Sequence, residues 1–228
     1  MRIVSKIKSL VIRPGARPRK VAFGIFRNML LELDLSHDMQ LCLGLWERET
    51  YACVKKAAAR CKWAVDVGAG RGELCVFLVK RSSAKRIVAV EPKISEAEFI
   101  KRNLGLNGEQ DNPKVEILNK FVGCSQDQDS VSLDALSMGS KEPGFVKIDV
   151  DGAEMDVLKS GEEILRKGSV DILLETHSAE LETASLEFLA KLGYQTKVIP
   201  NAWWRIVLPE RRPIPHNRWL WATNISGQ

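Results

Sequence analysis

The sequence has few groups that could stabilise the chain through disulfide bonds or a structural metal ion. Its five cysteines are odd in number and include no Cys-x-x-Cys pair, which argues against a disulfide framework and against a zinc site. No apolar run approaches the roughly 20 residues of a membrane span, and the N-terminal apolar stretch lacks the length and cleavage site of a signal peptide. The cysteine pattern predicts reduced thiols and a cytoplasmic location, and the length of 228 residues predicts a chain that can bury a sufficient core by itself.

Outside the first twenty residues, the chain has nearly equal numbers of basic and acidic residues. The formal net charge is +5, but the first twenty residues hold seven Lys or Arg and no acid, which leaves 27 basic and 29 acidic residues elsewhere. Residues 1–45 are therefore predicted to be a basic arm and capping segment, with a small hairpin and a helix over 21–45. Residues 1–20 could form either an amphipathic helix on an anionic membrane surface or a packed or solvated arm.

The remaining residues alternate between strand-like and helix-like patterns. Short apolar runs predict strands at 63–67, 86–90, 115–118, 145–149, 170–175, 194–199 and 219–224. Helical spacing predicts helices at 46–60, from 73, from a capping box at Ser95 and Glu98 to 103–108, and at 181–192. We expect an α/β, Rossmann-like, three-layer α/β/α fold whose seven-stranded, mostly parallel sheet has an antiparallel edge.

A glycine-rich turn follows the first of these strands. The run Val65-Asp66-Val67-Gly68-Ala69-Gly70-Arg71-Gly72 lets the backbone pass close to a bound nucleoside, because glycine has no β-carbon and adopts positive φ at little cost. Such a turn by itself fits a nicotinamide-binding unit, a methyltransferase or a plain strand-to-helix connection. Glu91, about 20 residues further on at the end of the next strand, is where a carboxylate accepts hydrogen bonds from ribose hydroxyls.

Two details favour S-adenosylmethionine over NAD as the nucleoside cofactor. The glycines do not follow the Gly-x-Gly-x-x-Gly spacing that supports a pyrophosphate. The carboxylate of Asp66 also suits the amino group and positive charge of S-adenosylmethionine better than it suits a diphosphate.

Acidic residues and one histidine follow the later strands, where ligands bind in an open parallel sheet. They are Asp149 and Asp151, then Glu175 and His177. His177 is the first candidate for a general base because its side chain titrates near neutral pH, and Asp149 and Asp151 are its competitors. A plainer interpretation makes Asp151 and Glu154 the cap of a helix, and a divalent metal on Asp149, Asp151 and Glu175 is a minor alternative.

The block Lys147-Ile-Asp-Val-Asp-Gly-Ala-Glu154, at its distance from the glycine turn, resembles the FkbM-type class I methyltransferases over about 46–224. Further matching positions are Val90-Glu91-Pro92, Asn103, Ser132-Leu133-Asp134, Leu174 to His177 and Trp219-Leu220. The resemblance implies a class I methyltransferase domain over 46–228. It also implies cofactor contacts with Asp66, Gly68, Ala69, Gly70, Gly72, Glu91, Pro92 and Asp149. Relatives commonly have Glu at the position of Asp151.

The activity implied is S-adenosylmethionine-dependent O-methyl transfer to a hydroxyl of a sugar, a glycosylated metabolite or another small metabolite. A nucleic-acid methyltransferase is the rival enzyme, but the chain lacks the Asn/Asp-Pro-Pro-aromatic motif and the Pro-Cys nucleophile, so no nucleic-acid partner is expected. The same pattern is also compatible with a nicotinamide oxidoreductase or with a non-catalytic scaffold subunit. Trp203, Trp204 and Arg205 are expected to line a sugar pocket or a buried edge, and 209–215 to form a rigid, solvated loop.

Overall fold

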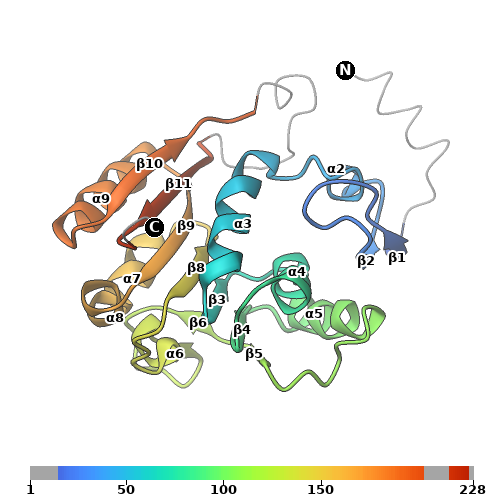
Figure 1. Cartoon of the computed structure of the whole chain (residues 1–228), viewed down its shortest axis with the longest axis horizontal. Helices are drawn as coiled ribbons and strands as arrows, with labels where there is room; N and C mark the ends of the chain where they lie inside the picture. The colour runs from blue at the N-terminus through green and yellow to red at the C-terminus, as the bar shows by residue number, and fades with distance from the viewer. Residues whose placement is uncertain (1–14, 203–215, 226–228) are drawn as a thin grey trace.

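The computed structural model describes residues 15–202 and 216–225 and shows the predicted three layers (Figure 1). Its central sheet has seven strands in the order β10-β11-β9-β8-β3-β4-β5. Their bounds are β3 Trp63–Val67, β4 Arg86–Val90, β5 Val115–Leu118, β8 Gly144–Ile148, β9 Val170–Thr176, β10 Gln195–Ile199 and β11 Arg218–Thr223. Each lies within two residues of a predicted strand, because short runs of buried apolar residues mark strands that are covered on both faces.

Alternate residues of each strand enter two separate hydrophobic clusters, one on each face of the sheet. Ala64, Phe145 and Leu173 pack into the first, which is covered by α3 (Tyr51–Arg60), α4 (Glu73–Arg81) and α5 (Ile94–Leu106). Val65 and Val146 pack into the second. Helices α6 (Leu133–Ser137), α7 (Glu154–Ser160), α8 (Glu162–Lys167) and α9 (Ala179–Lys191) cover that second cluster.

The antiparallel pairing lies at one end of the sheet, as predicted. Strand β11 runs antiparallel to both β9 and β10, and it lies between them rather than at the extreme edge. The other four pairings are all parallel. Since the parallel strands end at one edge of the sheet, the residues after β3, β4, β8 and β9 lie close together.

The capping segment contains a hairpin and a short helix, as predicted, but the first strand of the hairpin lies before residue 21. Strands β1 (Arg17–Lys20) and β2 (Leu30–Leu33) pair antiparallel, and α2 (Met39–Cys42) follows. Buried residues of the segment, such as Phe26, share the first hydrophobic cluster with α4 and α5. The proposed amphipathic helix over residues 1–20 is wrong for Arg17–Lys20, which is a strand, and residues 1–14 lie outside the described part of the chain.

Two local predictions differ from the structure. Helix α5 begins at Ile94 after Lys93, whose side chain makes no capping hydrogen bond, so the capping box at Ser95 and Glu98 does not form. The first predicted helix, 46–60, is divided into the 3₁₀ turn η1 (Arg48–Thr50) and α3. No conformation was predicted for 124–144, which contains β7 (Ser130–Val131), paired with β6 (Phe121–Val122), and α6.

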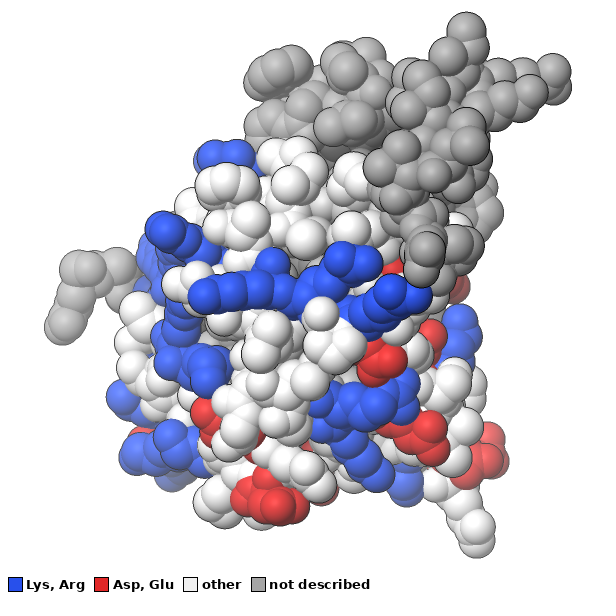
Figure 2. Space-filling view, turned by 90° about the vertical axis from the view of Figure 1, so that its right-hand side faces the viewer, with Lys and Arg blue, Asp and Glu red and all other residues white. Residues whose placement is uncertain are grey.

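Charge is unevenly distributed over the surface. Figure 2 shows the face that carries β1, β2 and α5, where many Lys and Arg side chains gather. Arg17 and Lys20 of β1 and Lys101 and Arg102 of α5 are exposed. Among the helices in residues 15–202 and 216–225, none has the length and apolar character needed to cross a membrane.

Candidate active site

A cavity of ≈ 300 Å³ lies where β3, β4 and β8 end. Its wall brings together five of the residues that the sequence singled out: Gly68, Glu91, Pro92, Asp149 and Asp151. Val67, Val90, Lys93, Lys120, Phe121, Val122, Val150 and Ala153 complete it. Predicted residues Asp66, Ala69, Gly70 and Gly72 lie outside this wall.

The glycine turn is held tightly against the sheet at its first residue. Gly68 has a φ of +74°, and a β-carbon added there would lie 1.9 Å from the backbone oxygen of Asp149. The N–H groups of Gly68 and Ala69 both donate to the backbone oxygen of Val90, at 2.9 and 3.1 Å. Gly70, with a φ of +51°, has open space at the same position. Gly68 is therefore required because the strand end that carries Asp149 approaches it so closely.

Glu91 joins this turn to the end of β4. Its side chain is buried, with Oε2 accepting from the Gly70 N–H at 3.0 Å and Oε1 accepting from the Lys93 N–H at 2.9 Å. The carboxylate therefore supports the turn and also lines the cavity, where a ribose contact was predicted.

Asp66 lies beneath the turn and not in the cavity wall. It is 1% exposed, and its Oδ1 is 3.9 Å from Nζ of Lys147. Burial raises the pKa of Asp66 to about 7, although the nearby Lys147 ammonium opposes this shift. Burial also lowers the pKa of Lys147, but the Asp149 and Asp66 carboxylates outweigh that effect and raise it. A contact of Asp66 with the cofactor stays a prediction.

Asp66 is expected to make the fold less stable as pH rises from about 4 to about 7. Within this window the folded state keeps a proton that the unfolded state has lost, because the pKa of Asp66 is about 7 in the folded chain against 3.8 ordinarily. The stabilising effect of this bound proton is fully present below the ordinary pKa of 3.8 and is lost as pH rises through the folded-state pKa of about 7. The melting temperature of Asp66→Asn should therefore rise relative to that of the wild type as pH increases. The expected rise is about 2–4 °C for each kcal/mol of stability that the wild type loses. A constant difference would contradict this.

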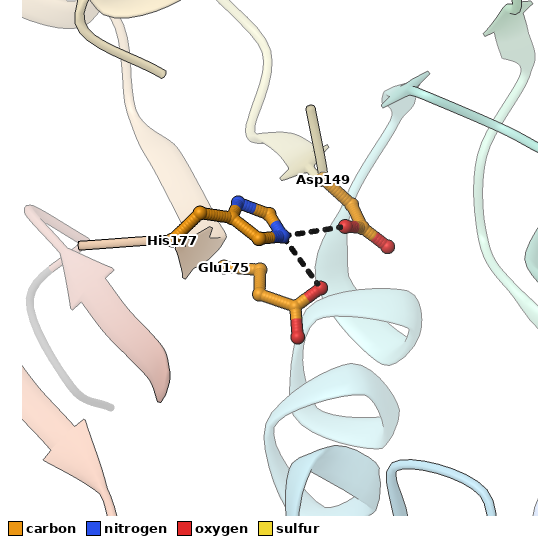
Figure 3. A group of neighbouring side chains, drawn as sticks. All are labelled: Asp149, Glu175 and His177. Carbon is orange, nitrogen blue, oxygen red and sulfur yellow. Dashed lines mark ion pairs between the residues drawn. The ribbon is translucent and has the colours of Figure 1, made fainter. Parts of the chain in front are cut away.

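His177 lies after β9 at the centre of a cluster of carboxylates (Figure 3). Its Nδ1 is 2.5 Å from Oε1 of the buried Glu154, which fixes the ring. Its Nε2 faces Asp149 Oδ1 at 3.9 Å, Glu175 Oε2 at 3.7 Å and Asp151 Oδ1 at 3.5 Å. The structure thus brings all three predicted catalytic side chains, His177, Asp149 and Asp151, to one place beside the cavity.

The plainer interpretation of Asp151 and Glu154 as a helix cap is wrong. Helix α7 begins at Glu154 after Ala153, and no side chain caps it. The side chain of Asp151 is 83% exposed at the rim of the site, whereas that of Glu154 is fully buried against His177. The spacing of Asp151 and Glu154 matches a capping box, but the Glu154 carboxylate contacts the buried His177 instead.

Sequence reasoning missed several residues of the site. Lys147 Nζ is 3.0 Å from Asp149 Oδ2 and positions that carboxylate. Lys120, Phe121 and Val122 form a cavity wall just after β5, and Phe121 is 60% exposed. Their signal in the sequence is their position after β5, because residues after each parallel strand face the ligand. The expected roles of 203–205 and 209–215 concern residues outside the described part of the chain.

A family model, the Methyltransferase FkbM domain, matches residues 110–196, which include β5, the Lys147–Glu154 block and His177. No curated protein matches the sequence.

Solved structures share the fold at low sequence identity. The precorrin-6Y C5,15-methyltransferase of Geobacter metallireducens has a TM-score of 0.53 and 16% identity, over 78% of this chain and 88% of that one. The methyltransferase FkbM of Methylobacillus flagellatus has a TM-score of 0.57 and 15% identity, over 71% of this chain and 43% of that one. A SAM-dependent O-methyltransferase of Thermotoga maritima has a TM-score of 0.52 and 18% identity, over 87% and 74%.

The described residues have the Rossmann-like fold that these methyltransferase structures share. The match to the Methyltransferase FkbM domain contains the Lys147–Glu154 block, on which the resemblance to the FkbM-type methyltransferases was based.

Proposed function

We propose that the chain is an S-adenosylmethionine-dependent O-methyltransferase that acts on a hydroxyl of a sugar, a glycosylated metabolite or another small metabolite. The observation that carries the proposal is His177, whose ring is fixed by Glu154 and whose Nε2 faces two cavity-lining aspartates. A hydroxyl nucleophile needs a proton acceptor in such a position, because it must lose its proton during or before attack.

The cavity suits the donor. It is polar where Glu91 enters it, and Gly68 contributes no side chain to its wall. Bound there, S-adenosylmethionine would supply a methyl group on a cationic sulfur. Glu91 would accept hydrogen bonds from the ribose, Phe121 would offer an aromatic surface for the adenine, and Asp149 would lie beside the methyl group.

The residues around His177 would then orient the acceptor and receive its proton. His177 Nε2 is the first candidate, with Glu154 holding Nδ1, and Asp149 or Asp151 is the alternative. Much of the rate enhancement would come from holding the acceptor oxygen in line with the methyl carbon. Lys147 would keep Asp149 in place through their 3.0 Å contact.

Replacing Glu91 by alanine is expected to weaken S-adenosylmethionine binding about 10- to 150-fold, since a charged hydrogen bond worth about 1.5–3 kcal/mol is lost. Isothermal titration measures this directly. Because Glu91 also supports Gly70 and Lys93, the matched variant is Glu91→Gln, which keeps an acceptor for one of the two N–H groups. An unchanged dissociation constant in folded Glu91→Ala would reject the ribose assignment.

The experiment that tests the function is a screen of hydroxylated metabolites with radiolabelled S-adenosylmethionine. We expect label in an ether-linked methyl group on a sugar or glycosylated compound. Label in nucleic acid and not in small molecules would favour the rival enzyme. Titration with NADH, which is expected not to bind, separates this proposal from an oxidoreductase.

A second proposal concerns peripheral contact with anionic membranes through the basic N-terminal segment. It is supported by the seven basic residues in the first twenty and by the basic face over β1 and α5 (Figure 2). Cosedimentation should occur with phosphatidylserine vesicles and decline as salt rises. Equal binding to neutral vesicles would contradict an electrostatic contact.

A further inference from the structure

We propose that Asp149, Glu175 and His177 form a binding site for one divalent metal ion. One ligand atom from each of these residues can be chosen so that all three lie within 4.8 Å of one another. The view of the three side chains shows Nε2 of the imidazole directed at both carboxylates (Figure 3).

The distances between these ligand atoms suit a bridging metal ion and are too long for direct hydrogen bonds. Nε2 of His177 is 3.9 Å from Asp149 Oδ1 and 3.7 Å from Glu175 Oε2, which is beyond hydrogen-bond length. A metal ion bonds such ligands at about 2.0–2.3 Å, so two ligand atoms can be up to roughly 4.0–4.6 Å apart. The two pairs are therefore spaced for a common ion between them.

The histidine supplies an independent observation. Its side chain is 3% exposed, and within residues 15–202 and 216–225 Nε2 has no hydrogen-bond partner. Its other nitrogen, Nδ1, contacts the fully buried carboxylate of Glu154 at 2.5 Å. Metal-binding histidines usually have this arrangement, in which a carboxylate holds one ring nitrogen and the other nitrogen binds the ion.

Charge also favours a cation at this place. Asp149, Asp151, Glu154 and Glu175 all face His177, and two of them, Glu154 and Glu175, are fully buried. Lys147 contacts Asp149 on its other side, at 3.0 Å. A divalent ion between the carboxylates would offset their mutual repulsion.

Two carboxylates and one imidazole suit Mn²⁺ and related divalent ions, because the oxygens favour hard cations and the nitrogen is a ligand for transition metals. The catalytic consequence rests on the proposed function. A hydroxyl bound to the ion would lose its proton more readily. With the ion bound, the lone pair of Nε2 would be used by the metal, so the alternative acceptor of the proposed function, the exposed Asp151, would receive the proton in place of His177.

Metal binding is tested on the full chain, without methyl donor, by titrating Mn²⁺ and recording electron paramagnetic resonance. We expect one Mn²⁺ per chain, with a nitrogen coupling in the spin-echo spectrum that changes when histidine carries ¹⁵N. His177→Gln and Glu175→Gln should lose this site. Glu154→Gln should weaken it by about 10- to 100-fold, because it holds the ligand without touching the ion. His37→Gln, which alters an exposed histidine outside the cluster, should bind as the wild type does.

Absence of bound Mn²⁺ in the wild type, absence of the nitrogen coupling, or equal binding by His177→Gln would overturn the proposal. The wild-type spectrum decides the question even if the variants do not fold. Titration of S-adenosylmethionine in the presence of EDTA is a separate measurement, so failure of the metal site and failure of the proposed function can be told apart.

Discussion

In the protein without a bound metal ion, replacing His177 by alanine is expected to lower the rate of methyl transfer by about 10²- to 10⁴-fold, which is the usual contribution of a positioned proton acceptor. S-adenosylmethionine affinity should be unchanged, because His177 does not line the cavity. Turnover of an acceptor from the metabolite screen, together with isothermal titration of the donor, measures both quantities.

Glu154→Gln is the matched variant for this result. Its side chain can still contact Nδ1 of His177, but it no longer offers a charged acceptor there. We expect a smaller fall in turnover, since the ring remains in place. Wild-type turnover in folded His177→Ala would contradict the role of the imidazole and leave Asp149 or Asp151 as the proton acceptor.

Replacing Gly68 by alanine is expected to disturb both the fold and the cofactor site. The new β-carbon would lie 1.9 Å from the Asp149 backbone oxygen, at a φ of +74°. Overpacking costs about 1–3 kcal/mol and the left-handed conformation about 1–2 kcal/mol. Thermal melting should therefore show a loss of stability of roughly 2–5 kcal/mol. Displacement of Asp149 by about 1 Å should lower turnover on the order of 10²-fold.

Gly70→Ala provides the control for this prediction. Gly70 also has a positive φ, at +51°, but no atom within the described residues lies within 4 Å of the added β-carbon. Only the conformational cost should appear, about 1–2 kcal/mol. Equal effects of the two substitutions would show that the close approach of Asp149 to Gly68 does not matter.

The sheet could be predicted closely from sequence because its strands are buried on both faces. Trp63–Val67 and Arg86–Val90 have the predicted bounds, since each is a short apolar run ended by a turn or a polar residue. The insertion of β11 between β9 and β10 depends on tertiary pairing and could not be read from the order of the elements.

The site was predictable in part for a related reason. Residues at or just after the ends of parallel strands meet at one edge, so Glu91, Asp149, Glu175 and His177 could be placed together from the sequence. The contact between His177 and Glu154 could not be predicted, because Glu154 has the spacing of a helix cap. Only the packing of α7 against β9 directs its side chain inward. The burial of Asp66 beside Lys147 was likewise set by cross-strand register, in which these two residues are opposite each other.

The most direct test of the central claim is a crystal structure of the protein with S-adenosylhomocysteine. The nucleoside is expected in the cavity between Gly68 and the β5 end, with its ribose hydroxyls within hydrogen-bond distance of Glu91 and its sulfur toward Asp149. A ligand bound elsewhere, or a cavity closed by protein side chains, would contradict the account.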